Sequence, residues 1–219
     1  MNRKTPADEF FGFGDAVIAP IDRLAAWRKS DALTAIQRED VKECLVELQM
    51  QFEDLAFAYR AIVWSNLARA SSAHDALEAL GDRDNADKGQ ELKALTALNR
   101  YRELTQPVGN AVVLLMQHAF MEQALAAVST LLDCSKEGKG SFFRQHIAGL
   151  KACLPGFAQS ADALDYLNNV TRPIANALKH GGWMIPLSRV TSEVVTATFG
   201  HISCVMADLE RALIRKYGQ

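Results

Sequence analysis

A chain of 219 residues, 49% of them apolar and 23% charged, has the composition of a soluble globular protein, which excludes disorder as the default. The formal net charge of −2 excludes the global basic excess of a typical nucleic-acid-binding protein, so any such contact must come from a few positioned residues. The opening residues contain no continuous apolar run followed by a small-residue cleavage site. We therefore expect a cytoplasmic protein.

The first predicted helix runs from Glu39 to about Ala70. Its apolar positions step by four and three, a heptad pattern typical of a long amphipathic helix that packs against another helix. This seam comprises Val41, Leu45, Leu48, Phe52, Leu55, Tyr59 and Ile62. Such a seam either belongs to the core of the chain itself or binds a protein partner.

A polar run then interrupts the helical pattern. Its glycines and aspartates predict a loop from Gly81 to Gly89. A shorter helix is expected over Gln90 to Leu104, and its spacing directs Leu92, Leu95 and Leu98 inward.

The most apolar helix begins near Pro107, since proline is favoured in the first turn, and runs to about Cys134. Its segment Ala111 to Leu132 is long enough to raise the question of a membrane span. Four polar side chains lie near the middle of this segment, namely Gln117, His118, Glu122 and Gln123. They predict a buried core helix and no membrane association.

Two more helices are bounded by recognisable start and stop signals. One runs from Ser141, which can cap it, to Leu154, where Pro155-Gly156 stops it. The next spans roughly Asp162 to His180 and ends before Gly181-Gly182, which can supply a left-handed residue. Its inward stripe is formed by Leu164, Leu167, Thr171, Ile174 and Leu178.

The last predicted helix follows a short extended connection, Trp183 to Val190, and is capped by Thr191 or Ser192. Its apolar residues again step by four and three: Val195, Phe199, Ile202, Met206, Leu209 and Leu213. No segment alternates with period two, so the predicted fold class is all-α, a helical bundle. We expect an N-terminal helical region (1–105) and a C-terminal bundle (106–219), either separate or joined in one continuous domain.

The four cysteines form no recognisable metal or redox motif. Cys44, Cys134, Cys153 and Cys204 include no C-x-x-C pair, and no histidine stands at metal-ligand spacing from them. Because free cysteine behaves as a small hydrophobic residue, we expect four buried, reduced thiols. No metal ion and no other cofactor are expected.

A polar stripe lies beside the apolar one on the helix that ends at His180. Asn168, Arg172, Asn176 and His180 recur every four residues, so they share a face that drifts by about 40° per step. This set can act on RNA, because an imidazole can accept the 2′-hydroxyl proton, a guanidinium can hold the phosphate and an amide can orient either. In the structural alternative Arg172 pairs with Asp165, and His180 only satisfies the last carbonyls of the helix.

The stretch "NALKHGG", Asn176 to Gly182, resembles the motif of the HEPN domains (higher eukaryote and prokaryote nucleotide-binding). The RNA-cleaving members of this family carry an arginine usually followed by asparagine, then a few residues, a histidine and a glycine-containing turn. The apolar run around Glu122 is similar to the family's first helix, which has a glutamate near its middle. The resemblance covers about Pro107 to Gln219 and implies a four-helix bundle.

At one position this chain departs from the family's pattern. Immediately before the asparagine stands Ala175 instead of arginine, and Arg172 lies one turn earlier as the substitute. The resemblance implies a homodimer with two motifs facing one cleft, and metal-independent RNA cleavage in a toxin or anti-phage defence system. In that interpretation His180 is the base or its phosphate-binding partner, Arg172 the phosphate clamp and Asn176 the orienting group.

Further side chains accompany this predicted site. Lys179 and Asn168 are candidate substrate-binding residues, and Glu122 and His118 are candidate supporting residues. Glu122 is expected either to have a raised pKa or to pair with His118 or Lys179, the commoner arrangement for a buried carboxylate. The alternative function is that of a non-catalytic helical interaction or regulatory subunit, which binds a protein partner through the Val41 to Ile62 seam.

Overall fold

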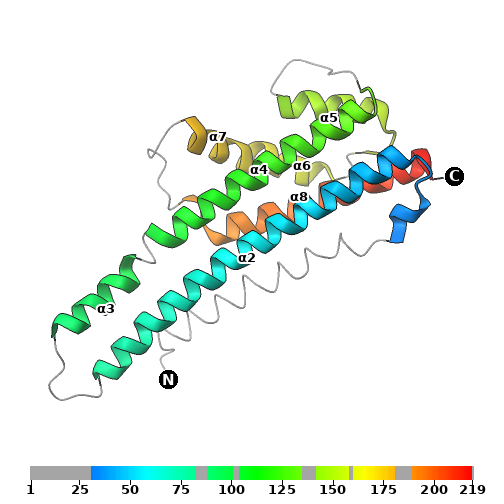
Figure 1. The fold of residues 1–219 in the computed structure, drawn as a ribbon. Coiled ribbons are helices and arrows are strands. Elements are labelled where there is room, and N and C mark those ends of the chain that lie inside the picture. The colour runs from blue at the N-terminus through cyan, green and yellow to red at the C-terminus, as the bar shows by residue number, and fades with distance from the viewer. Residues whose placement is uncertain are drawn as a thin grey trace, which may run out of the picture.

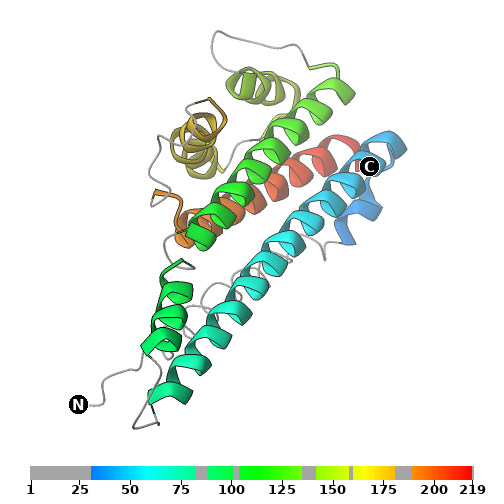
Figure 2. The same cartoon turned by 60° about the vertical axis from the view of Figure 1, so that its left-hand side comes forward.

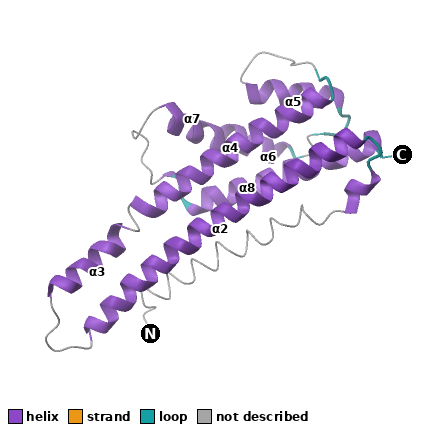
Figure 3. Ribbon diagram, viewed as in Figure 1, coloured by secondary structure: helices purple, strands orange, loops and turns teal. Residues whose placement is uncertain are grey.

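The structure, a computed structural model, describes residues 31–81, 88–100, 104–134, 142–157, 160–180 and 189–218. Within these ranges the regular elements are helices and no strand occurs (Figure 3), so the all-α prediction is confirmed. The elements in chain order are η2 (Asp31–Ala35), α2 (Glu39–Gly81), α3 (Lys88–Arg100), α4 (Gln106–Leu131), α5 (Phe142–Cys153), α6 (Ala161–Tyr166), the π-helical segment η4 (Leu167–Thr171), α7 (Arg172–His180) and α8 (Ser192–Tyr217).

The long helix α2 runs antiparallel to α4, and α8 lies alongside both (Figure 1). The short helix α3 folds back along the C-terminal half of α2. In the two views of Figures 1 and 2, α5 and α7 lie on the side of α4 that faces away from α2, and α6 packs against α8. The predicted polar stripe of α7 is therefore placed next to α4.

The heptad seam of α2 faces the core. Six of its seven residues are at most 4% exposed, and Ile62 packs against the same hydrophobic cluster. The ring of Phe52 lies 5.5 Å from that of Phe120 on α4 and 5.9 Å from that of Phe199 on α8, measured between centroids. The seam thus belongs to the chain's own core, and the predicted use of it as an open partner surface is wrong for this structure.

The predicted inward leucines of α3 are a further correction. Leu92 is 66% exposed, Leu95 is 43% exposed and Leu98 is half-buried, whereas Ala94 is only 7% exposed. α3 packs mainly against α2. A helix with one main neighbour buries only a narrow stripe of its surface, and in α3 the buried residue of that stripe is Ala94. The leucines consequently lie outside that stripe.

The bounds of the predicted loop before α3 also change. Gly81 is the last residue of α2 and Gly89 lies in the first turn of α3, so both are helical. Residues 82–87, the rest of the predicted loop, lie outside the described residues. Helix α2 thus continues beyond the predicted end at Ala70. The described part of α3 reaches Arg100, and residues 101–103, which precede its predicted end at Leu104, lie outside the described residues.

Helix α4 has proline in its first turn, as predicted for Pro107. Among the helices that the structure describes, it is the one whose length and composition would allow it to cross a membrane. However, 56% of its most apolar window is buried inside the fold, as in the core helix of a soluble protein. Both Gln117 and His118 are buried there, and the Gln117 side-chain amide donates to the carbonyl oxygen of Val195 at 2.9 Å.

The helix predicted over Asp162 to His180 is continuous but contains a π turn. The backbone N–H of Arg172 donates to the carbonyl of Leu167, five residues earlier. Pro173 accounts for this turn, because it has no N–H and its ring would clash with the carbonyl four residues before it. The inward stripe follows the prediction: its residues up to Thr171 are buried, and the last two, Ile174 and Leu178, pack against the core.

The last helix, α8, matches its prediction. Thr191 is the N-cap, and its hydroxyl accepts a hydrogen bond from the N–H of Val194 at 3.4 Å. The six residues of its apolar stripe are buried. The glycines predicted to end α7, Gly181-Gly182, and most of the predicted extended connection lie outside the described residues, as does the predicted cap Ser141 of α5.

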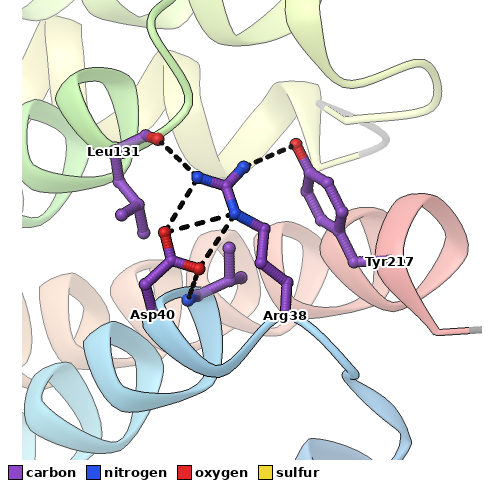
Figure 4. Close-up of polar contacts among 5 residues, drawn as sticks. Arg38, Asp40, Leu131 and Tyr217 are labelled. Carbon is purple, nitrogen blue, oxygen red and sulfur yellow. Dashed lines mark hydrogen bonds and ion pairs between the residues drawn. The ribbon is translucent and has the colours of Figure 1, made fainter.

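One guanidinium joins the beginning of α2 to the ends of α4 and α8 (Figure 4). Arg38 Nε donates to Asp40 Oδ1 at 2.9 Å, and Nη2 donates to Asp40 Oδ2 at 2.8 Å and to the Leu131 carbonyl at 3.2 Å. Its Nη1 donates to the Tyr217 hydroxyl at 3.3 Å. The hydrogen-bonded guanidinium lowers the pKa of the Asp40 carboxyl, so this contact favours the charged form.

The four thiols are free, but they are less buried than predicted. Cys204 is exposed on the outer face of α8, and the other three are half-buried. Burial and a hydrogen bond with Cys153 raise the pKa of Cys134 to about 12. Its thiolate is therefore strongly disfavoured.

Candidate functional site

The polar residues of α4 and α7 meet in one cluster. Glu122 Oε2 lies 3.6 Å from Lys179 Nζ, and Glu122 Oε1 lies 3.5 Å from His118 Nε2. The prediction that Glu122 pairs with a neighbouring polar group is thus confirmed for both partners. Since the side chain of Glu122 is 29% exposed and that of His118 is 3% exposed, the cluster extends from the surface into the core.

His118 is the buried member of this cluster. Burial lowers the pKa of its imidazole, and the charges of Lys179 and Arg172 lower it further. The Glu122 carboxylate and a hydrogen bond with Asn176 act in the opposite direction. The net effect favours the neutral imidazole, whose burial prevents it from touching a substrate outside the fold. His118 can therefore support the site but cannot act as its base.

The exposed face of α7 carries the other predicted residues. Arg172 and Asn176 are half-buried, whereas Lys179 and His180 are exposed. Ala175, at the position of the family's arginine, is completely buried. An arginine at position 175 would project into the core and could not reach a ligand outside the fold. The half-buried Arg172 is partly accessible from solvent, so its guanidinium can reach such a ligand.

Arg172 and His180 are separated along the axis of α7. Eight residues of helix correspond to a rise of about 12 Å, with Asn176 midway between them. The two side chains can therefore contact the same ligand only if it lies along the helix. A strand of RNA has this extended shape, whereas a compact metabolite does not.

Asn168 lies at the centre of a second polar group. Arg144 Nε of α5 donates to Asn168 Oδ1 at 3.3 Å, and Arg172 Nη1 donates to the same oxygen at 3.5 Å. The Asn168 amide donates to Asn169 Oδ1 at 2.7 Å, and the Asn169 amide donates to Asp165 Oδ1 at 2.8 Å. The predicted neighbours Asn168 and Arg172 are thus brought together.

A pocket of about 490 Å³ lies next to Asn168, between α5 and α6. Two cations and two carboxylates are among the residues that line it. The lining consists of Arg144, Ile147, Ala148, Lys151, Ala161, Asp162, Leu164, Asp165 and Asn168. Its volume falls within the range of small-molecule and cofactor sites.

Arg144 was not predicted as a site residue. It lies 24 residues before Asn168 in the sequence, so no helical spacing connects the two. Only the packing of α5 against the following helices brings them together. No signal in the sequence distinguishes Arg144 from other arginines on exposed helical faces.

Metal-ligating side chains do not gather in the part of the chain that the structure describes. Within it, no group of three or more histidine, cysteine, aspartate and glutamate residues is arranged to hold a metal ion. The pair formed by His118 and Glu122 thus has no third ligand among the described residues.

Comparisons with known proteins do not place this chain in a family. No family model matches it, and neither the curated proteins nor the solved structures that were compared contain a match.

Proposed function

We propose that this chain is a HEPN-like, metal-independent endoribonuclease of a cytoplasmic toxin or anti-phage defence system. The observation that carries the proposal is the meeting of α4 and α7, where Glu122 contacts both His118 and Lys179. This arrangement supports the resemblance because it places the mid-helix glutamate beside the helix that holds the "NALKHGG" stretch. The contact also fixes the orientation of α7 and hence of its exposed face.

The reaction follows from the groups on that face. In the homodimer that the resemblance implies, His180 of one copy accepts the proton of a ribose 2′-hydroxyl, and the 2′-oxygen attacks the adjacent phosphorus, which lies at Arg172 of the other copy. The bond from phosphorus to the 5′-oxygen breaks, and the leaving oxygen takes a proton from water or from a protonated histidine. The products are a 2′,3′-cyclic phosphate and a 5′-hydroxyl. Arg172 holds the phosphate through its planar fork and stabilises the charge that develops on it.

The remaining predicted residues have positioning roles in this proposal. Asn176 lies close enough to His118 to raise the pKa of its imidazole, at the place where α7 packs against α4. Lys179 pairs with Glu122, and its side chain is still 36% exposed, so its charge adds to the attraction for a polyanion. Asn168 orients the guanidinium of Arg172.

The proposal includes the homodimer that the resemblance implies, with two copies of the α7 face lining one cleft. A symmetric dimer brings His180 of one copy close to the face of the other, which shortens the reach between base and phosphate clamp. Light scattering at micromolar concentration tests this part. A mass of twice 24.1 kDa is expected, and a monomer at every concentration would contradict it.

The activity is tested with a 5′-labelled single-stranded RNA in buffer that contains EDTA. Wild type is expected to release fragments that end in a 2′,3′-cyclic phosphate. The variants His180→Ala and Arg172→Ala should reduce the rate by at least about 100-fold, the lower range for loss of a general base. His74→Ala on α2 is the matched control and should cleave like wild type.

Three further experiments test the ribonuclease. A strand in which every ribose is 2′-deoxy must remain intact, because it lacks the attacking oxygen, so its cleavage would contradict the proposed chemistry. Arg172→Lys should not restore activity, since lysine lacks the planar fork. Absence of cleavage by wild type over a panel of RNAs of varied sequence would contradict the function as a whole.

A second candidate function is favoured by the outward face of α2. Val46, Met50 and Phe57 are 40%, 61% and 72% exposed, on the face opposite the buried seam. Exposed apolar side chains at helical spacing are typical of a protein-binding surface. In this alternative the chain is a non-catalytic regulatory subunit, and Phe57→Asp would abolish binding to its protein partner while His180→Ala would have no effect.

A further inference from the structure

Three apolar side chains form an exposed stripe on α2. Val46, Met50 and Phe57 are each at least 40% exposed. Their spacing of four and seven residues places them within about 40° of one another around the helix axis and over about 17 Å along it. A single exposed apolar residue is ordinary on a protein surface, whereas several that adjoin one another mark an interaction site. We call these three residues the outer stripe.

The spacing of the outer stripe is that of a helix that packs against another helix. If Met50 and Phe57 occupy the a positions of a heptad, Val46 occupies a d position, and Glu53, at the next d position, is half-buried. The buried seam of α2 follows the same rule on the opposite side of the helix, where α4 and α8 cover it. The outer stripe is exposed, so an α-helix is the structure that fits it best.

Two carboxylates border the outer stripe on one side. Glu47 and Asp54 are exposed and lie seven residues apart, so they share one edge of α2 at a separation of about 10 Å along the axis. Glu47 accepts a hydrogen bond from the neutral Gln51 amide at 3.2 Å, which leaves its negative charge uncompensated. Neither carboxylate takes part in an ion pair within the part of the chain that the structure describes. We call this pair the acidic edge.

The acidic edge restricts what can cover the outer stripe. Charges beside the apolar positions of packed helices determine which partner is accepted. RNA is a polyanion that the two carboxylates repel, so this surface is separate from the proposed RNA-binding face of α7. An antiparallel second copy would bring two acidic edges opposite each other, and that contact is unfavourable as well. A helix with lysine or arginine beside its apolar residues is attracted instead.

We propose that the outer stripe and the acidic edge bind a basic amphipathic helix of a partner protein. The apolar residues of that helix pack on the outer stripe, and two of its cations, seven residues apart, face Glu47 and Asp54. Phe57 is the anchor, because an exposed aromatic ring loses the most apolar surface on binding. This inference specifies the partner of the second candidate function and rests on that function's exposed face, whereas it does not depend on the ribonuclease.

The first test uses a synthetic peptide as the probe. It is a fluorescein-labelled helix of three heptads with leucine at a and d, lysine at e and g, and alanine or glutamine elsewhere, so its like charges keep it from pairing with itself. A second peptide is identical except that glutamate replaces every lysine. Fluorescence anisotropy with the full chain should give a Kd below about 100 µM for the lysine peptide, and a Kd at least about 10-fold higher for the glutamate peptide.

Removal of the anchor should weaken this binding. Phe57→Asp should raise the Kd for the lysine peptide about 10-fold or more. Leu92→Asp on α3 is the matched control, because Leu92 is exposed to a similar extent but lies on another helix, so this variant should bind like wild type. Circular dichroism should show the same helix content in both variants as in wild type, since both substituted side chains are exposed.

Reversing the charge of the acidic edge provides a sharper test. The double variant Glu47→Lys/Asp54→Lys should prefer the glutamate peptide by about 10-fold or more, and loss of folding cannot produce such a reversed preference. The matched control is Asp75→Lys/Glu91→Lys, which changes the net charge by the same amount at exposed positions near the end of α2 and on α3. This control should keep the preference of wild type for the lysine peptide.

The results separate this inference from the second candidate function. If wild type binds both peptides equally and Phe57→Asp weakens both, the face is a protein-binding surface as in that function, and the inference of a basic partner is overturned. If wild type binds neither peptide, or if Phe57→Asp binds the lysine peptide unchanged, the inference is overturned as well. A wild-type dimer that Phe57→Asp converts to a monomer would show that a second copy covers the outer stripe, which also overturns it.

The ribonuclease is assessed independently with the same proteins. The Phe57→Asp and Glu47→Lys/Asp54→Lys variants should cleave RNA at the rate of wild type, because neither substitution touches the α7 face. If wild type does not cleave RNA but binds the peptides as stated, the ribonuclease fails while the basic partner is supported.

Discussion

Lys179 Nζ lies 3.6 Å from Glu122 Oε2, and this contact joins the short polar helix α7 to the apolar helix α4. Glu122 also contacts the buried His118 at 3.5 Å, so the same carboxylate contacts both a lysine at the surface and an imidazole in the core. The contact therefore stabilises the packing of α7 as well as the local charge.

Removing this carboxylate should destabilise the fold modestly. Glu122→Gln keeps the size of the side chain but loses its charge, so we expect the free energy of unfolding to fall by about 0.5–1 kcal/mol. Urea denaturation measures the change. The matched control is Glu43→Gln on the exposed side of α2, which should alter the free energy by less than about 0.5 kcal/mol. Equal effects of the two substitutions would contradict the role of Glu122.

The pKa of His118 predicts how stability depends on pH. Burial lowers this pKa below the ordinary 6.5, so the folded state favours the neutral form while the unfolded chain takes up a proton near pH 6.5. The contribution to stability is therefore complete above about pH 6.5 and is lost as pH falls below it. Burial lowers the pKa of His201 as well, so that residue acts in the same direction.

His118→Gln removes the first of these two titrations. Although the variant should be less stable at pH 7.5, its melting temperature should fall less steeply than that of wild type between about pH 6.5 and 5.5. Circular dichroism at a series of pH values measures both slopes. Parallel curves for the two proteins would show that His118 does not contribute to the acid sensitivity.

Two glycines should respond in opposite directions to the same substitution. Gly156 ends the turn after α5 with φ of +86°, and a Cβ there would meet Arg215 Nη2 at 2.9 Å. Gly156→Ala should thus destabilise the protein by about 1–2 kcal/mol. Gly200 is helical and a Cβ there would meet no atom within 4 Å, so Gly200→Ala should stabilise it by about 0.4–1 kcal/mol.

Chemical denaturation of the two glycine variants provides this comparison. If the two free energies of unfolding change with the same sign, the backbone conformation described for Gly156 or the open space beside Gly200 is wrong.

The thiols should differ in reactivity toward a disulfide reagent at pH 8. Cys204 is exposed and should react first, whereas Cys134, with its pKa raised to about 12, should stay unreactive until the protein unfolds. Cys204→Ser should remove the fast phase, and Cys134→Ser should leave it unchanged. A fast phase that persists in Cys204→Ser would contradict the assignment.

The long helices were predicted well from the sequence, because the apolar residues that recur along each of them are buried against several neighbouring helices. The seams of α2 and α8 are buried as expected, since each of these helices packs in the same central cluster. The same reasoning failed for α3, where Leu92 and Leu95 are exposed. Periodicity identifies an apolar face, but it does not say how many helices will cover that face.

The candidate site was predictable only where its contacts are local or follow from charge. The approach of Asn168 to Arg172 follows from a spacing of four residues, and the pairing of Glu122 with His118 follows from the same spacing on α4. Arg144 could not be predicted, because its contact with Asn168 depends on how α5 packs against the helices that follow it.

The π turn before Pro173 is equivalent to one additional residue in an otherwise regular helix. Each residue of an α-helix turns the chain by about 100°, so deleting one residue from η4 would rotate all of α7 by that angle relative to α6. Asn176 and Lys179 would then no longer point toward α4, and Ala175 would leave the core. The orientation of the entire polar face thus depends on a single inserted position upstream of it.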